Sequence, residues 1–210
     1  MARVKSEAMR RSILAAAAAE FSERGYLKTT VNSIASAAGT APSNVYVYFT
    51  SKVEIALAVY EPWFKRRILA LEQAVAKATT PETKTRRLVH GLLQDIALDK
   101  SGYTSTLVEA LATAMPTDDY RPDLLLWAEH KLTRMIYGAA PKAFEDEDSV
   151  LPVARLLMMI FDSVALRKNL KQQNEIIRGM LDFIVDLVTA EAKSPAHLQK
   201  RKRQRAVVAP

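Results

Sequence analysis

The sequence has no cysteine, only three histidines and only six glycines among its 210 residues. Without cysteine there are no disulfides and no thiolate ligands for a metal ion. The histidines, His90, His130 and His197, are scattered, and the chain has no zinc-protease, phosphate-loop or nucleophile-elbow motif. We therefore expect that the protein is not an enzyme and that it holds no metal ion or other cofactor.

Long apolar runs are also lacking, since no stretch approaches the roughly 20 residues that a helix needs to cross a bilayer. The N-terminus imitates a secretory signal peptide, because a basic segment precedes an apolar run that starts at Ile13. That run has only seven residues, five of them alanine, and Glu20 ends it. We interpret it as part of an amphipathic helix and expect a cytoplasmic protein with no membrane partner.

The residues that are abundant favour an all-α fold, because alanine and leucine dominate over β-branched residues within a hydrophobic content of 49%. The net charge of +7 is uneven. Residues 1–52 carry seven Lys and Arg against three Glu, residues 53–192 carry 17 against 20 acids, and residues 193–210 carry six and no acid. Basic ends around an acidic middle predict a polyanion as the N-terminal partner and a different partner for the middle.

Two short helices joined by a glycine turn are predicted between residues 30 and 49. Thr30 is suited to cap the first helix, whose apolar face comprises Val31, Ile34, Ala35 and Ala38. Gly39 ends it, because glycine enters the left-handed conformation without steric cost. Pro42 suits the first position of the second helix.

The second helix has an apolar face and a polar face. Val45, Tyr48 and Phe49 recur at helical spacing and predict a buried face. The opposite face is short and polar enough to enter a DNA major groove, and comprises Ser43, Asn44, Tyr46 and Val47. This arrangement is typical of a helix-turn-helix, although helical hairpins with a glycine turn also occur outside DNA-binding proteins.

A lysine follows the second helix. Ser51 is suited to cap the next helix, with Glu54 at the capping-box position and Lys52 in the first turn. A lysine at this helix end opposes the helix dipole, so we interpret it as a residue that faces an external anion such as a DNA phosphate.

Further helices are expected at about 6–24, 51–78, from 81 onward, 104–113, within 118–139, 153–170 and 173–192. Pro62 should end or kink the second of these near Glu61 and is a candidate hinge. The last two are apolar on more than one side, which predicts a four-helix bundle shared by two chains of a homodimer. The alternative is that both line the core of one chain. The predicted dimer interface comprises Leu156, Met159, Ile160, Ile177, Met180, Leu181, Ile184 and Leu187.

Several elements between residues 10 and 60 together resemble the tetracycline-repressor (TetR) family of bacterial regulators. They are Arg11, Ile13 and Leu14, then Phe21, Glu23, Arg24, Gly25 and Tyr26, then Thr30, Val31, Ile34 and Ala35, then Ala38 and Gly39, and finally Val45, Tyr46, Tyr48, Phe49, Ser51 and Lys52. The resemblance implies a three-helix DNA-binding domain followed by a helical effector-binding and dimerisation domain. We expect these domains at residues 1–50 and 51–192, with a basic tail at 193–210 that either adds DNA affinity or is merely solvated.

The resemblance also implies roles for individual residues. The positions that match the recognition helix are Pro42, Ser43, Asn44, Tyr46 and Val47, and those that match phosphate contacts are Thr30, Tyr46, Tyr48 and Lys52. Two residues depart from the family pattern, because Ala41 stands where a capping serine is frequent and Thr40 where valine is frequent. Thr40 is therefore an alternative cap, and the recognition helix starts at one of two positions.

The expected mechanism is docking of a dimer on a palindromic site in double-stranded DNA. Ser43 and Asn44 would read base edges, while Val47 would make an apolar contact such as one to a thymine methyl. Phosphates would be neutralised by Lys52, the two tyrosines and a basic arm that comprises Arg3, Lys5, Arg10 and Arg11.

A regulator also needs a ligand that binds its two states unequally. Aromatic, methionine and histidine side chains of the middle region could line an apolar pocket for a small, partly apolar effector, although each residue taken singly is more often part of the core packing. They are Trp63, Phe64, His90, Tyr103, Trp127, His130, Met135, Tyr137, Met159 and Phe161. We therefore expect a repressor released by its ligand; the alternatives are a ligand-independent or activating regulator and a non-specific DNA-packaging protein.

Overall fold

The computed structural model describes residues 6–115, 118, 123–167, 179 and 183. Every element assigned in this part of the chain is a helix, so the predicted all-α fold is confirmed. The chain splits into two compact units, Met1–Arg67 with Ala97–Leu124 and Ile68–Ile96 with Leu125–Pro210. The domain boundary that the sequence predicts between residues 50 and 51 stays a prediction.

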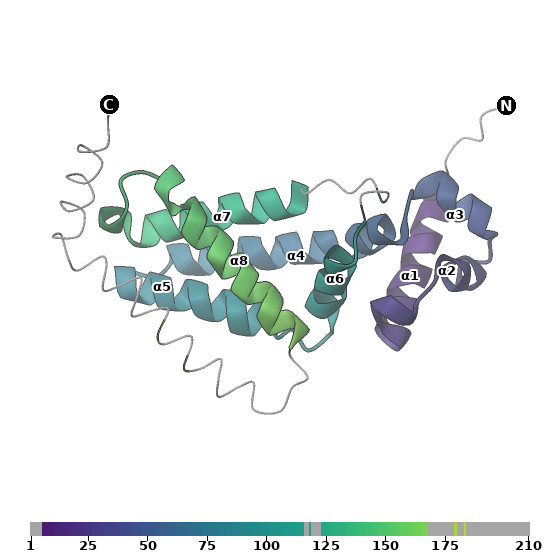
Figure 1. Cartoon of the computed structure of the whole chain (residues 1–210), viewed down its shortest axis with the longest axis horizontal. Helices are drawn as coiled ribbons and strands as arrows, with labels where there is room; N and C mark the ends of the chain where they lie inside the picture. Colours follow the sequence, from purple (N-terminus) through teal and green to yellow (C-terminus); the bar gives the residue numbers. More distant parts are fainter. Residues whose placement is uncertain (1–5, 116–117, 119–122, 168–178, 180–182, 184–210) are drawn as a thin grey trace. The chain divides into compact units, whose positions relative to one another are not determined.

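The helices follow one another in the order shown in Figure 1. They are α1 (Glu7–Lys28), α2 (Val31–Ala37), α3 (Pro42–Tyr48), α4 (Lys52–Ala76), α5 (Pro81–His90) with its π-helical continuation η1 (Gly91–Ile96), α6 (Tyr103–Ala112), α7 (Asp123–Ala139), the 3₁₀ turns η3 (Pro141–Ala143) and η4 (Asp148–Val150), and α8 (Leu151–Leu166). The helix expected at 173–192 and the tail at 193–210 lie outside the described residues, apart from Gly179 and Phe183.

A chain of aromatic rings joins α1, α4 and α6 in the first unit. Phe21 lies 5.7 Å from Tyr26 and 6.0 Å from Tyr60, measured between ring centroids. Tyr60 lies 5.1 Å from Tyr103, which in turn lies 5.5 Å from Trp63. Burial raises the pKa of Tyr60 to about 12. Tilted and edge-on ring pairs add to the stability gained from burial, so α6 is firmly attached to the helix-turn-helix part of this unit.

Pro62 does not end α4, in contrast to one of the two outcomes expected from the sequence. The helix continues through it from Lys52 to Ala76. Because proline has no backbone N–H, it cannot bond the carbonyl of Ala58 one turn earlier. The buried Tyr60, Phe64 and Ile68 on either side of this position explain why the helix persists, since their burial outweighs the loss of one bond.

Gly91 allows two helices of the second unit to approach closely. A Cβ built on Gly91 would lie 2.3 Å from Cδ1 of the buried Leu71 on α4. We expect Gly91→Ala to lower the free energy of unfolding by about 1–3 kcal/mol, because Leu71 must leave its place in a packed core. Urea unfolding measures this loss, and Gly138→Ala is the control, since a Cβ at Gly138 meets nothing within 4 Å. Equal stability of the two variants would contradict the close approach.

Helix α8 has a buried and an exposed apolar face. Ala154, Leu157 and Phe161 are buried, whereas 53% of Leu156 and 69% of Met159 is exposed. Ile160 is intermediate, and the other predicted interface residues, Ile177, Met180, Leu181, Ile184 and Leu187, lie outside the described part of the chain. Dimerisation through this face stays a prediction.

The segment Asp148–Leu166, which comprises η4 and α8, bears on the expectation that long apolar runs are lacking. By length and composition alone it could cross a membrane, with a mean hydropathy of 1.7. A core helix meets the same criteria, and 39% of this segment is buried, including Ala154, Leu157 and Phe161.

Asp162 on α8 predicts a pH-dependent stability. Burial raises the pKa of its carboxyl from 3.8 to about 6. Between these values the folded state binds more protons than the unfolded state, so stability falls as the pH rises through this window. Asp162→Asn should therefore raise the urea midpoint at pH 7.5 and change it much less at pH 4. An equal change at both pH values would contradict this explanation.

Candidate nucleic-acid interface

Helix α2, the turn at Gly39 and α3 form the predicted helix-turn-helix. The Thr30 hydroxyl accepts the N–H of Ser33 at 3.0 Å, and the Ser33 hydroxyl accepts the N–H of Thr30 at 3.2 Å. This reciprocal cap fixes the start of α2. Gly39 has a φ of 66°, a value at which a side chain would be strained, so the sharp exit from α2 requires glycine.

The recognition helix starts at Pro42, and Thr40 is not its cap. Ala41 occupies the N-cap position without a side-chain hydrogen bond. The Thr40 hydroxyl instead accepts a hydrogen bond from the side-chain amide of Asn44 at 2.8 Å. This bond holds the amide group of Asn44 in one orientation and leaves its carbonyl oxygen and second N–H for another partner. The sequence reading missed this role of Thr40.

Helix α3 separates its buried and exposed residues mostly as predicted. Val45 is fully buried and Phe49, just after the helix, is 2% exposed, whereas Tyr48, the third residue of the predicted buried face, is half-buried. On the other side, 55% of Tyr46 and 40% of Val47 is exposed. Of the other predicted base-reading residues, Pro42 and Ser43 are exposed and Asn44 is half-buried. A helix of this size with one solvent-facing polar side has the dimensions that a major groove admits.

A hydrogen bond and a cation–π contact join the start of α1 to the end of α3. The Tyr48 hydroxyl accepts the N–H of Ser6 at 3.0 Å, so its own proton is still available to a phosphate. The guanidinium of Arg10 lies 5.4 Å from the centroid of the Phe49 ring, a cation–π distance. Arg11 is exposed. The predicted arm residues Arg3 and Lys5 lie outside the described part of the chain.

Lys52 has a structural role that was not predicted from the sequence. Its ammonium donates hydrogen bonds of 3.0 Å to the carbonyls of both Tyr26 and Thr29, and it lies 4.1 Å from the centroid of the Tyr26 ring. Burial lowers the pKa of Lys52. These carbonyls and the ring interact favourably with the cation, so its position against the helix dipole does not by itself require an external anion. Its contact with a phosphate stays a prediction.

The cap of α4 also differs in detail from the expected box. The Ser51 hydroxyl accepts the N–H of Glu54 at 3.2 Å, as predicted. The carboxylate of Glu54, however, accepts from the backbone and the hydroxyl of Thr50 rather than from Ser51. These bonds fix the turn between α3 and α4, directly beside Lys52.

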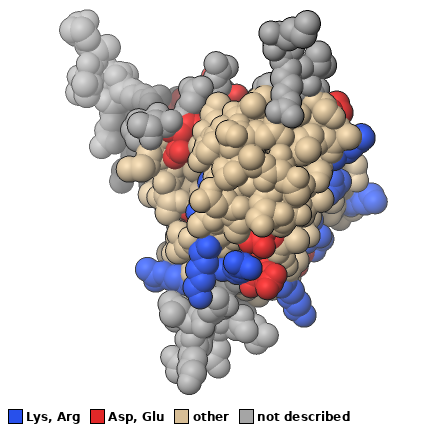
Figure 2. All heavy atoms as spheres, turned by 90° about the vertical axis from the view of Figure 1, so that its right-hand side faces the viewer, with Lys and Arg blue, Asp and Glu red and all other residues tan. Residues whose placement is uncertain are grey.

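Figure 2 looks onto the end of the view in Figure 1 where α1, α2 and α3 lie. A large uncharged area occupies the centre of this face; Lys and Arg side chains project below it and at its right-hand border, and Asp and Glu side chains lie among them and at the upper left. Cations beside an uncharged surface suit a duplex, since phosphates flank the grooves in which the base edges lie.

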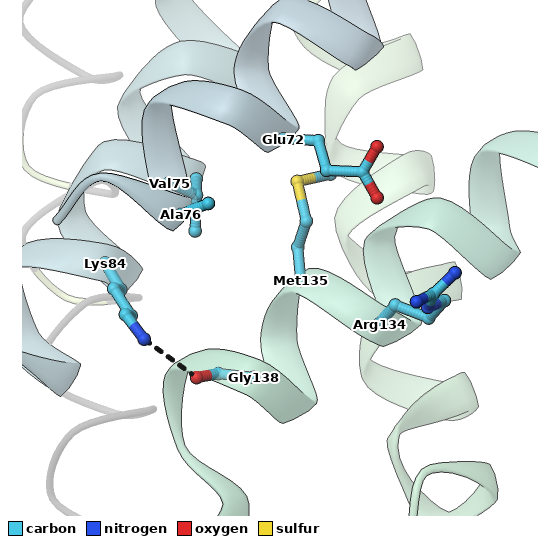
Figure 3. Close-up of a pocket in the computed structure, with 7 residues that line it drawn as sticks. All are labelled: Glu72, Val75, Ala76, Lys84, Arg134, Met135 and Gly138. Carbon is cyan, nitrogen blue, oxygen red and sulfur yellow. Dashed lines mark hydrogen bonds between the residues drawn. The ribbon is translucent and has the colours of Figure 1, made fainter.

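The residues predicted to line an effector pocket are divided between the two units. Trp63, Phe64 and Tyr103 belong to the first unit. The other seven belong to the second, where His90, His130 and Met159 are exposed, Trp127 and Tyr137 intermediate, and Met135 and Phe161 buried. His90 lies 3.8 Å from the carboxylate of Asp95. Of the ten, Met135 lines the pocket of the second unit shown in Figure 3.

Comparison with known proteins agrees with this geometry. Residues 13–59 match the family of bacterial regulatory proteins described as the tetR family. The HTH-type transcriptional activator FasR of Mycolicibacterium smegmatis is 30% identical over 101 residues, which cover 48% of this chain and 46% of FasR. The match thus spans about half the length of this curated relative.

Solved structures extend the similarity of fold to most of the chain. A TetR transcriptional regulator from Rhodococcus sp. RHA1 has a TM-score of 0.61 and 19% identity, covering 86% of this chain and 95% of that one. The fatty acid degradation regulator FadR from Bacillus halodurans has a TM-score of 0.56 and 19% identity, covering 85% and 97%. AibR, solved with isovaleryl coenzyme A and operator DNA, has a TM-score of 0.55 and 16% identity, covering 83% and 97%.

The fold and the exposed second helix define a helix-turn-helix protein with a helical C-terminal part. Over that motif, residues 13–59, the chain is similar to the tetR family of bacterial regulatory proteins, and beyond it the solved structures extend the likeness of fold alone.

Proposed function

We propose that this protein is a homodimeric, sequence-specific repressor that binds a palindromic operator and is released from it by a small, partly apolar ligand. The observation that carries the proposal is the division of α3, where Val45 anchors the helix inside while Ser43 and Tyr46 face solvent. Thr30, Tyr48 and Lys52 surround this helix with groups that can hold phosphates.

Release by a ligand is supported by two observations. AibR, which has a similar fold, was solved with an acyl coenzyme A and with operator DNA. In this chain the second unit contains a pocket with charged and apolar walls. A ligand acts as an effector only if it binds the DNA-competent state with a different affinity from the other state.

Activation is the second candidate function, because the relative FasR is named an activator. Repressor and activator share the same docking surface and differ in where the operator lies relative to the promoter. Transcription from a promoter that carries the operator, with and without the protein, distinguishes the two.

Selection of duplexes from a random pool tests the site-specific function directly. We expect one palindrome to emerge and to bind about 10³-fold or more tightly than a scrambled duplex at physiological salt. The logarithm of its affinity should fall linearly with the logarithm of the salt concentration. Equal affinity for all duplexes would instead support a DNA-packaging protein.

A further inference from the structure

A pocket in the second unit lies between the C-terminal half of α4, the first turns of α5 and the end of α7 (Figure 3). Its volume is about 280 Å³. Pockets for drug-sized ligands measure roughly 300–1,000 Å³, so this one suits a smaller molecule.

The charges around this pocket favour an anion. Glu72 is neutralised by Lys131, whose ammonium lies 2.9 and 3.1 Å from its two carboxylate oxygens. Lys84 donates one long bond of 3.4 Å to the carbonyl of Gly138 and has two further N–H groups. Arg134 is exposed and forms no ion pair with any residue that the structure describes. Among the residues that the structure describes, neither Lys84 nor Arg134 thus has a carboxylate partner.

The remaining wall is apolar. Val75 and Met135 are 4% and 5% exposed, and Ala76 adds a methyl group beside them. Figure 3 shows Lys84 on one side of Met135 and Arg134 on the other. A bare inorganic anion would leave this apolar surface uncovered, whereas an aliphatic chain would remove it from water at about 25 cal/mol per Å².

We infer that this pocket binds a small monocarboxylate with a short aliphatic chain. The carboxylate accepts from the ammonium of Lys84, and Arg134 adds attraction at the rim. The chain lies against Val75 and Met135. The further step, that this ligand is the effector, rests on the proposed function. It is supported by α4, because this one helix carries both Val75 of the pocket and Lys52 of the predicted DNA-binding surface.

Calorimetric titration of the full-length protein with butanoate, hexanoate and octanoate tests the binding. We expect at least one acid to bind, and hexan-1-ol, hexylammonium and inorganic phosphate to bind at least 10-fold more weakly. Lys84→Met, which keeps the aliphatic stem, should weaken the acid at least 10-fold, and Lys84→Arg should restore most of the affinity. Arg86→Met is the matched control on the same helix, since Arg86 pairs with Glu82 outside the pocket.

A second variant acts on volume rather than charge. Gly138→Leu should fill the pocket from α7 and abolish binding, and it is expected to fold because a Cβ there meets nothing within 4 Å. Failure of all three acids to bind, equal binding of phosphate, or undiminished binding to both Lys84→Met and Gly138→Leu would overturn the inference. Fluorescence anisotropy of labelled operator DNA tests whether the bound acid releases the protein from DNA. An acid that binds the protein without changing its affinity for the operator would confirm the binding site but refute release of the operator through it.

Discussion

Replacing Asn44 by alanine will reduce discrimination at one base pair of each operator half-site by about 1–3 kcal/mol. The amide of Asn44 is held by Thr40 at 2.8 Å, so its carbonyl oxygen and free N–H are presented together. This pair matches the N6 and N7 positions of adenine. Competition anisotropy with operators changed at one base pair at a time measures the loss, which should appear at a single position.

Thr40 makes this prediction sharper. Thr40→Val keeps the shape of the side chain but removes the acceptor for the Asn44 amide, so it should lower discrimination at the same base pair by a smaller amount. Thr40→Ser retains the hydroxyl and is the control. If Asn44→Ala binds the selected and the scrambled operator with an unchanged ratio, Asn44 does not read a base.

Local chemistry made the helix-turn-helix predictable from the sequence. A cap at Thr30, a positive φ at Gly39 and a proline at the first turn of α3 each depend on a few neighbouring residues, and the structure has all three. The sequence also predicted correctly that Val45 is buried and Tyr46 exposed, because helical spacing separates them.

Contacts between distant segments were not predictable in this way. Lys52 bonds carbonyls that lie 23 and 26 residues earlier in the chain, and no periodicity encodes such a pair. Gly91, the first residue of the π-helix, lies where Leu71 approaches from another helix, a contact between residues 20 positions apart. Pro62 does not end α4, because the local cost of proline is outweighed by the burial of Tyr60 and Phe64, which no local rule includes; a kink at Pro62 stays a prediction.

The residues that line the ligand pocket were also not predictable from amino-acid type alone. The prediction selected aromatic, methionine and histidine side chains, of which Trp63 and Tyr103 pack on each other. Of that set Met135 lines the pocket of the second unit, and the rest of its wall comes from Glu72, from the small residues Val75, Ala76 and Gly138, and from the cations Lys84 and Arg134. A cavity lies where side chains fail to fill space, and this depends on the packing of three helices rather than on the composition of one.

Replacing Lys52 by methionine will both destabilise the first unit and weaken DNA binding. The variant keeps the aliphatic stem but removes two bonds from a charged donor, which we expect to cost about 2 kcal/mol in the free energy of unfolding. It also leaves two carbonyls at the C-terminal end of α1, that of Tyr26 in its last turn and that of its C-cap Thr29, without this partner.

Two measurements separate the structural role of Lys52 from its role toward DNA. Urea unfolding reports the stability, and the salt dependence of operator affinity reports the phosphate contact, whose loss should reduce the slope by about 1 per half-site. Binding to selected and scrambled duplexes should weaken alike, because phosphates carry no sequence information. Lys28→Met, which removes the same charge from an exposed position in α1, is the control. A stable variant with a reduced slope would refute the structural role, and an unstable variant with an unchanged slope would refute the phosphate contact.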